Sequence, residues 1–252
     1  MGVACLDPDE VDFPWIDRSL LTTDTAGLCT RADIVVELIG GIEPARTFIL
    51  RAIESGASVV TANKALLAKH GPEIYRAAEK RGVDIYFEAA VGGAIPIVRP
   101  LRESLVGDSV TSMLGIVNGT TNYILDEMTT KGLDFGVALK DAQDKGYAEA
   151  DPTGDIEGLD AANKAAIMAT LGFHTPVSID DVTVSGFPAV TADDIASATP
   201  QPNVIHLLAF VDNGHAAHTP PVHPPPIGDA HPLAPVPGTS NALLPPGPPA
   251  PA

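Results

Sequence analysis

The sequence contains few cysteines, few basic residues and no long apolar run. Cys5 and Cys29 are its only cysteines, too few for a disulfide framework and without the spacing of a metal site. Fifteen Lys and Arg residues stand against 32 Asp and Glu, so the formal net charge of -17 disfavours nucleic acid and anionic lipid as partners. No segment approaches the roughly 20 apolar residues of a membrane span, and the acidic N-terminus does not look like a signal peptide. We therefore expect a cytoplasmic protein that binds neither nucleic acid nor a membrane.

The 252 residues are 45% hydrophobic, which is enough to form a real core. After about thirty irregular residues with at most one short helix, β-branched apolar segments alternate with segments of helical spacing. Strands are expected at 34–41, 57–63 and 84–91, and helices at 44–56 and 64–82, the second helix being broken or kinked near Gly71 and Pro72. The first strand, IVVELIGG, is typical of a strand buried on both faces. The alternation predicts a parallel α/β sheet in residues 1–90.

Residues beyond Gly92 follow a different pattern. A helix is expected at 94–105, a strand at 109–117, and three helices at about 120–131, 135–145 and 156–173. This succession predicts a second domain of α+β type in residues 91–218.

The C-terminal part of the chain is rich in proline, with 15 of the 24 prolines between Pro200 and the end. The segment NVIHLLAF can still be ordered, but residues 219–252 are expected to form a poorly ordered tail without regular helix or central strand. Four histidines in this part have an irregular spacing that favours a solvated loop over a metal site. They are His215, His218, His223 and His231.

Asp160 and Lys164 lie four residues apart in a predicted helix, which places them on one helix face. Carboxylates crowd the segment that leads into this helix, and Lys145 and Lys164 are the cations that balance them. The acidic residues are Glu149, Asp151, Asp155, Glu157 and Asp160. A surface ion pair and a site for a cationic ligand both fit these charges.

The segment from Ala142 to Lys164, AQDKGYAEADPTGDIEGLDAANK, resembles the long signature of the homoserine dehydrogenase family. The matching positions are Ala142, Gly146, Tyr147, Ala148, Asp151, Pro152, Asp155, Ile156, Gly158, Asp160 and Lys164. The strings VVELIGG, SVVTANKALLA, FEAAVGGAIPI and GIVNGTTNYIL also look like this family. The resemblance is close over about residues 33–187.

The resemblance implies an NAD(P)-dependent oxidoreductase that interconverts L-homoserine and L-aspartate 4-semialdehyde in threonine and methionine biosynthesis. It implies an incomplete Rossmann-type parallel sheet followed by an α+β substrate and dimerisation domain, in a homodimer or homotetramer. Lys164 would be the proton donor and acceptor, a role that suits a partly desolvated ammonium. Glu149 and Asp160, supported by Asp155, would bind the ammonium group of the amino-acid substrate.

The same resemblance implies that NADP or NAD binds at Lys64, Gly40, Gly41 and Gly146. Lys64 follows a predicted strand at the carboxyl edge, where open α/β sheets bind ligands. A solvated lysine at a helix start is the alternative. The glycines would let the cofactor approach the backbone closely, or they simply form turns.

The string EAAVGGAIP corresponds to a structural sodium loop in this family. Glu88 would supply a carboxylate, and Val91, Gly93 and Ile95 would supply backbone carbonyls. Such oxygen donors suit a hard cation.

The family's glycine-rich G-x-G-x-x-G turn, which receives the cofactor's pyrophosphate, does not occur in the sequence. We therefore expect a chain truncated at both ends, with an exposed sheet edge and weakened cofactor binding. A catalytically inactive fragment that acts only as an oligomerisation or interaction module is the alternative to an active dehydrogenase.

Overall fold

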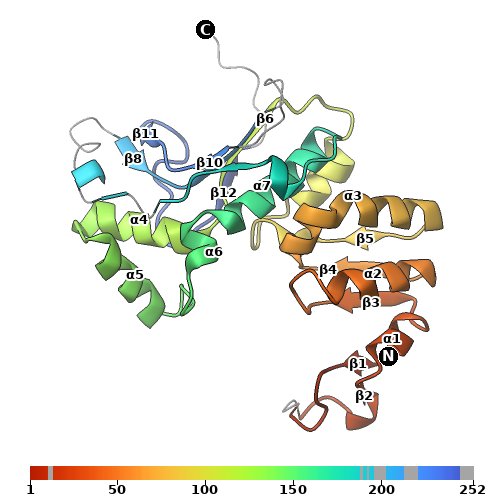
Figure 1. The fold of residues 1–252 in the computed structure, drawn as a ribbon. Helices are drawn as coiled ribbons and strands as arrows, with labels where there is room; N and C mark the ends of the chain where they lie inside the picture. The colour runs from red at the N-terminus through yellow and green to blue at the C-terminus, as the bar shows by residue number, and fades with distance from the viewer. Residues whose placement is uncertain (11–13, 188–189, 192, 196–202, 213–220, 245–252) are drawn as a thin grey trace. The chain divides into compact units, whose positions relative to one another are not determined.

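The protein divides into two units, Met1–Phe87 and Glu88–Ala252 (Figure 1). The computed structural model describes residues 1–10, 14–187, 190–191, 193–195, 203–212 and 221–244. Within these residues no helix combines the length and the apolar character needed to cross a membrane.

The first unit is built on a parallel sheet with the strand order β3-β4-β5. The strands are β3 (Ile34–Glu37), β4 (Ser58–Thr61) and β5 (Ile85–Tyr86), and the helices between them are α2 (Ala45–Glu54) and α3 (Lys64–Arg81). The predicted alternation of strand and helix is confirmed. The expected break near Gly71 is absent, since α3 continues through Pro72 as one helix of 18 residues.

The edge strand β3 is buried on one face only, so the prediction of burial on both faces is wrong. Ile34 and Val36 are 63% and 60% exposed, whereas Glu37 is buried. Alternate side chains of a strand point to opposite faces, so Ile34 and Val36 share the exposed face. Helix α2 packs against β3 within this unit.

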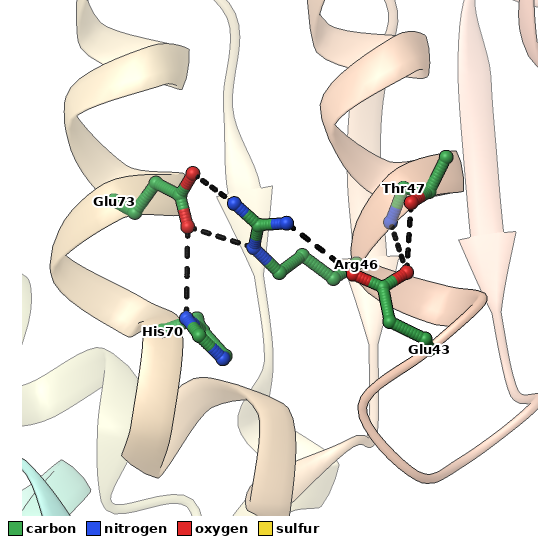
Figure 2. A network of polar contacts seen from close by, with 5 residues as sticks. All are labelled: Glu43, Arg46, Thr47, His70 and Glu73. Atoms are coloured by element: carbon green, nitrogen blue, oxygen red, sulfur yellow. Dashed lines mark hydrogen bonds and ion pairs between the residues drawn. The ribbon is translucent and has the colours of Figure 1, made fainter.

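An ionic network ties the first turn of α2 to α3 (Figure 2). The Arg46 guanidinium donates from Nε to Glu73 Oε2 at 2.8 Å and from Nη2 to Glu73 Oε1 at 2.5 Å. It also pairs with Glu43 at 3.3 Å, while Glu43 accepts a hydrogen bond from the Thr47 hydroxyl at 2.7 Å. His70 Nδ1 lies 3.6 Å from Glu73 Oε2. The hydrogen bonds from Arg46 lower the pKa of Glu73. This bidentate contact fixes the orientation of α2 relative to α3.

The N-terminal segment contains more regular structure than a loop with one short helix. β1 (Val3–Ala4) pairs in parallel with β2 (Leu21–Thr22), which follows the 3-10 turn η1 (Arg18–Leu20). The short helix α1 (Thr25–Cys29) begins after Asp24, whose carboxylate accepts the Gly27 N–H.

The second unit contains a five-stranded sheet with the order β12-β6-β9-β10-β7 and a separate pair, β11-β8. The strands are β6 (Ser112–Ile116), β7 (Thr183–Val184), β8 (Asn203–Ile205), β9 (Leu208–Asp212), β10 (Pro221–His223), β11 (Pro226–Gly228) and β12 (Ala242–Leu244). β9 is antiparallel to both of its neighbours, β6 and β10. Together with the helices, this arrangement gives the predicted α+β character.

Three of the predicted helices of this unit are found with shifted ends, whereas the helix expected at 94–105 is reduced to a short π-helical turn. The helices are α4 (Gly119–Lys131), α5 (Phe135–Asp144), α6 (Thr153–Ile156) and α7 (Leu159–Gly172), with short turns η2 (Glu88–Ala90), η3 (Pro100–Ser104) and η4 (Ile179–Asp181). The predicted helix 156–173 is interrupted at Gly158, whose φ of 82° is left-handed. α7 packs against β7, β9 and β10.

Residues 221–244 contain three short strands, which differs from the poorly ordered tail without a central strand that the prolines suggested. β10 lies inside the sheet between β9 and β7. Pro221 is the first residue of this strand, a position where the missing N–H of proline is tolerated. Val222 and Leu233 are buried, so the segment contributes apolar side chains that secure it to the core.

Candidate functional site

Lys164 and Asp160 form a largely buried ion pair on one face of α7. Lys164 Nζ lies 2.6 Å from Asp160 Oδ2, and the two side chains are 13% and 12% exposed. The same ammonium donates to the carbonyl oxygen of Val117 at 2.5 Å. A pair so far removed from water differs from an ordinary surface ion pair, and burial of this kind requires the additional hydrogen bonds that are present.

Asn118 brings Asp155 into contact with this pair. Its Nδ2 donates to Asp155 Oδ1 at 2.7 Å and to Asp160 Oδ2 at 2.8 Å. Its Oδ1 accepts the Thr121 N–H at 2.8 Å and so caps α4. Sequence reasoning did not single out Asn118. An Asn before a helix is a recognisable cap, but its contacts with residues 37 and 42 positions away leave no local signal.

The turn between α6 and α7 is held in place by close backbone packing. Gly158 adopts a φ of 82°, and a Cβ there would stand 3.0 Å from a methyl group of Val184. A Cβ on Gly186 would stand 2.5 Å from the carbonyl oxygen of Ile156. These glycines allow the chain to turn tightly between Asp155 and Asp160.

Glu149 and Gly146 lie in the loop between α5 and α6. Gly146 has a φ of 75°, and open space surrounds the position of a Cβ. Glu149 is exposed, and Gln143 Nε2 donates to its backbone carbonyl at 3.1 Å. The contacts described above for Asp155, Asp160 and Lys164 run through Asn118 and the Lys164–Asp160 pair.

Lys145 does not balance the carboxylates of the signature segment but belongs to a network between α4 and α5. Its Nζ lies 2.8 Å from Asp141 Oδ2 and 2.5 Å from the Tyr123 hydroxyl, which itself donates to Asp141 at 2.5 Å. The hydrogen bonds to Asp141 and Tyr123 raise the pKa of Lys145 well above its ordinary value. Lys164, by contrast, contacts Asp160 directly.

The candidate cofactor residues of the first unit are joined by a buried carboxylate. Glu37, at the end of β3, accepts the N–H groups of Ile39 at 2.7 Å and Gly40 at 3.1 Å, and the Thr61 hydroxyl at 2.6 Å. Asn63 donates to the Gly41 carbonyl at 2.7 Å and caps α3. The network joins the Gly40–Gly41 turn to the helix start, although sequence reasoning did not identify Glu37.

Gly40 and Gly41 have left-handed φ values of 79° and 68°, which favour glycine. Nothing lies within 4 Å of a Cβ placed on either residue, so their backbone is open to approach. Lys64 is the first residue of α3. The predicted position at the carboxyl ends of β3 and β4 is thus observed for all three residues.

The candidate sodium residues lie in the loop that begins the second unit. Glu88 accepts the backbone N–H groups of Val98 at 2.8 Å and Arg99 at 2.9 Å. The Ile95 carbonyl accepts the Ile97 N–H at 2.9 Å. In the described residues no group of three or more His, Cys, Asp or Glu side chains forms a metal site. His223 and His231 belong to the described chain, whereas His215 and His218 lie outside it.

The first unit is a parallel α/β unit of the nucleotide-binding type, and the second is an α+β unit with a partly buried Lys-Asp-Asn-Asp cluster. A chain with these two units has the organisation of a two-domain oxidoreductase. The family model "Homoserine dehydrogenase" matches residues 96–247, and "Homoserine dehydrogenase, NAD binding domain" matches residues 6–88. The chain belongs to the homoserine dehydrogenase family.

Individual relatives agree with this assignment. The chain is 50% identical over 251 residues to the homoserine dehydrogenase of Synechocystis, with 97% of this chain and 57% of that protein covered. It is 52% identical over 232 residues to the enzyme of Corynebacterium glutamicum, covering 89% of this chain and 52% of that protein. The chain therefore spans little more than half the length of the curated relatives it matches.

Solved structures give the same result. A homoserine dehydrogenase from Thiobacillus denitrificans superposes with a TM-score of 0.85 at 44% identity, covering 89% of this chain and 53% of that one. A hyperthermophilic archaeal homoserine dehydrogenase in complex with NADPH gives a TM-score of 0.75 at 28% identity, covering 88% and 64%.

Proposed function

We propose that this chain carries the substrate-binding and proton-transfer groups for the interconversion of L-homoserine and L-aspartate 4-semialdehyde, in the synthesis of threonine and methionine. The observation that carries the proposal is the cluster of Lys164, Asp160 and Asp155, in which the Lys164–Asp160 pair is largely buried. It contains two carboxylates against one ammonium. A further cationic group, such as the ammonium of an amino acid, would neutralise the cluster.

Lys164 is suited to proton transfer by the way in which it is held. An ammonium has three N–H donors, and Asp160 and the Val117 carbonyl accept two of them. The third can point at the oxygen of the aldehyde, and in the direction of reduction Lys164 would donate the proton that this oxygen gains. Asp155 and Asp160, with Glu149 from the loop between α5 and α6, would bind the substrate's ammonium.

NADP or NAD would exchange the hydride with the substrate carbon. We propose that Gly40 and Gly41 hold the cofactor through their open backbone, that Lys64 contacts it, and that Gly146 allows close approach in the second unit. The space around the two β3 glycines supports this assignment. We further propose a partial dinucleotide-binding domain in residues 1–90, a catalytic domain that begins at residue 91 and continues past the expected end at 218 through strands β10, β11 and β12, and assembly as a homodimer or homotetramer.

We also propose a sodium ion at Glu88 and the carbonyls of Val91, Gly93 and Ile95. The donor set fits a hard cation, because each Glu88 oxygen that accepts one N–H keeps a second lone pair. Sodium chloride should then raise the Tm more than choline chloride does. Glu88→Gln should abolish that difference.

Homoserine-dependent reduction of NADP tests the main proposal. The purified chain, Lys164→Ala and the control Lys140→Ala are compared by the absorbance of the reduced nicotinamide. Lys140 is an exposed residue of α5, so its variant should keep the wild-type rate, whereas Lys164→Ala should lose at least about a hundredfold, the scale of general acid catalysis. Equal rates in all three proteins would remove Lys164 from the mechanism. Binding of homoserine without turnover would favour a chain that binds substrate but depends on further residues for the redox step.

A further inference from the structure

One amide in the second unit joins two carboxylates that come from different helices. Asn118 is 5% exposed, and its Nδ2 lies 2.7 Å from Asp155 Oδ1 and 2.8 Å from Asp160 Oδ2. Both N–H groups of the amide are thus used by carboxylates. Asp155 belongs to α6 and Asp160 to α7.

The orientation of this amide is fixed by its other end. Asn118 Oδ1 accepts the Thr121 N–H at 2.8 Å in the first turn of α4. A flipped amide would direct its oxygen at two carboxylates and its NH₂ at an N–H donor, so all three hydrogen bonds would be replaced by repulsive contacts. The residue before it, Val117, accepts the Lys164 ammonium. Two consecutive residues after β6 therefore hold Asp155, Asp160 and Lys164.

We infer that Asn118 is a positioning residue that holds Asp155 and Asp160 side by side as one binding site for the ammonium group of the substrate. The Asp155 and Asp160 carboxylates repel each other because both are negatively charged. The neutral amide of Asn118 donates one hydrogen bond to each carboxylate and so holds them together without adding charge. The expected effect of Asn118 on homoserine binding rests on the proposed function. The contacts of Asn118 with Asp155 and Asp160 do not depend on that function.

If Asn118 only caps α4, Asn118→Ser should leave homoserine affinity unchanged. If Asn118 positions Asp155 and Asp160, the same substitution should weaken homoserine binding. Serine caps helices as well as asparagine does, but its hydroxyl has one hydrogen to donate and a shorter reach. The dissociation constant for homoserine, measured by calorimetry, should rise about tenfold or more in Asn118→Ser. The matched control Asn163→Ser, also in the signature segment, should bind as the wild type does. Wild-type affinity in Asn118→Ser would overturn the inference.

Asn118→Asp supplies a pH signature that a purely structural role does not produce. The introduced carboxylate faces Asp155, Asp160 and Lys164 and has no hydrogen to donate, so homoserine binding at neutral pH should be weaker than in Asn118→Ser. When protonated, the new carboxyl donates one hydrogen bond. The ratio of its affinity to that of Asn118→Ser should therefore rise as the pH falls. A ratio that does not change with pH would count against the inference.

A double-mutant cycle tests the contact without homoserine. Asn118→Ser, Asp155→Asn and the double variant are compared by their Tm shifts. The shift caused by Asn118→Ser should be smaller in the Asp155→Asn background, because the repulsion that the amide opposes has been removed. Additive shifts would overturn the inference. A wild-type chain that does not bind homoserine would instead refute the proposed function, and the cycle would still decide the role of Asn118.

Discussion

Replacement of Gly186 by alanine should displace the turn that separates Asp155 from Asp160. A Cβ at this position would stand 2.5 Å from the Ile156 carbonyl oxygen and 2.6 Å from the Cα of Glu157. The Cβ and the Ile156 carbonyl oxygen would have to separate by about 0.9 Å to reach the 3.4 Å of an ordinary van der Waals contact. Both obstacles are backbone atoms, so no side-chain rotation can relieve the clash.

The surroundings limit how far the backbone can move. The Phe187 N–H donates to the Ile156 carbonyl at 3.0 Å, and the Ser185 N–H donates to the Val222 carbonyl at 2.7 Å. The Phe187 ring is fully buried against Phe135. Overpacking of such a site costs about 1–3 kcal/mol, which for a chain of this size corresponds to a fall in Tm of roughly 2–12 °C.

Thermal unfolding of Gly186→Ala beside Gly154→Ala measures this effect. Gly154 lies in α6 with no atom within 4 Å of a Cβ and no left-handed φ, so its alanine variant should be neutral or more stable by about 0.5–1 kcal/mol. Homoserine affinity should fall in Gly186→Ala and be retained in Gly154→Ala. Equal Tm values for the wild type and Gly186→Ala would refute the argument, because they would show that the segment moves aside at no cost.

Two further substitutions probe buried polar groups. Glu37→Gln replaces an oxygen that accepts N–H or hydroxyl groups with an amide donor, so the first unit should lose about 1.5–3 kcal/mol, measured by urea unfolding against the exposed control Glu79→Gln. Burial lowers the pKa of His206 below its ordinary value of 6.5, and Asp126 and His231 are the charged groups that act on it. Below pH 6.5 the unfolded chain therefore binds a proton that the folded chain does not, and the free energy of unfolding falls as the pH falls. The Tm of His206→Gln should decrease less than that of the wild type between about pH 7 and pH 5; parallel pH profiles would contradict this.

The sequence predicts those parts of the protein that depend on local pattern. The strands and helices of residues 34–86 follow from apolar spacing, and the Asp160 to Lys164 contact follows from a separation of one helical turn. The exposed face of β3 could not be predicted, because IVVE has the composition of a buried strand and only the tertiary arrangement determines what covers it. The uninterrupted course of α3 through Pro72 likewise depends on packing along the whole helix.

The prolines of the C-terminal segment misled the prediction for a different reason. A high proline content indicates that backbone N–H donors are missing. It does not show whether the apolar residues between the prolines are buried. Leu233 packs with Ile116 and Leu208 in a core cluster, and partly buried Val236 and Ala242 pack against it. The burial of these side chains compensates for the backbone hydrogen bonds that proline cannot donate.

The same segment supports the start of α4 and therefore the candidate site. Asn122 Nδ2 donates to the carbonyls of Val236 at 3.1 Å and Gly238 at 2.9 Å. A Cβ on Gly119 would stand 2.5 Å from the Thr239 carbonyl oxygen, so α4 and this loop are in close contact immediately after Asn118. The signature segment supplies the charged groups of the cluster, but their arrangement depends on a helix start that distant, proline-rich chain holds in place.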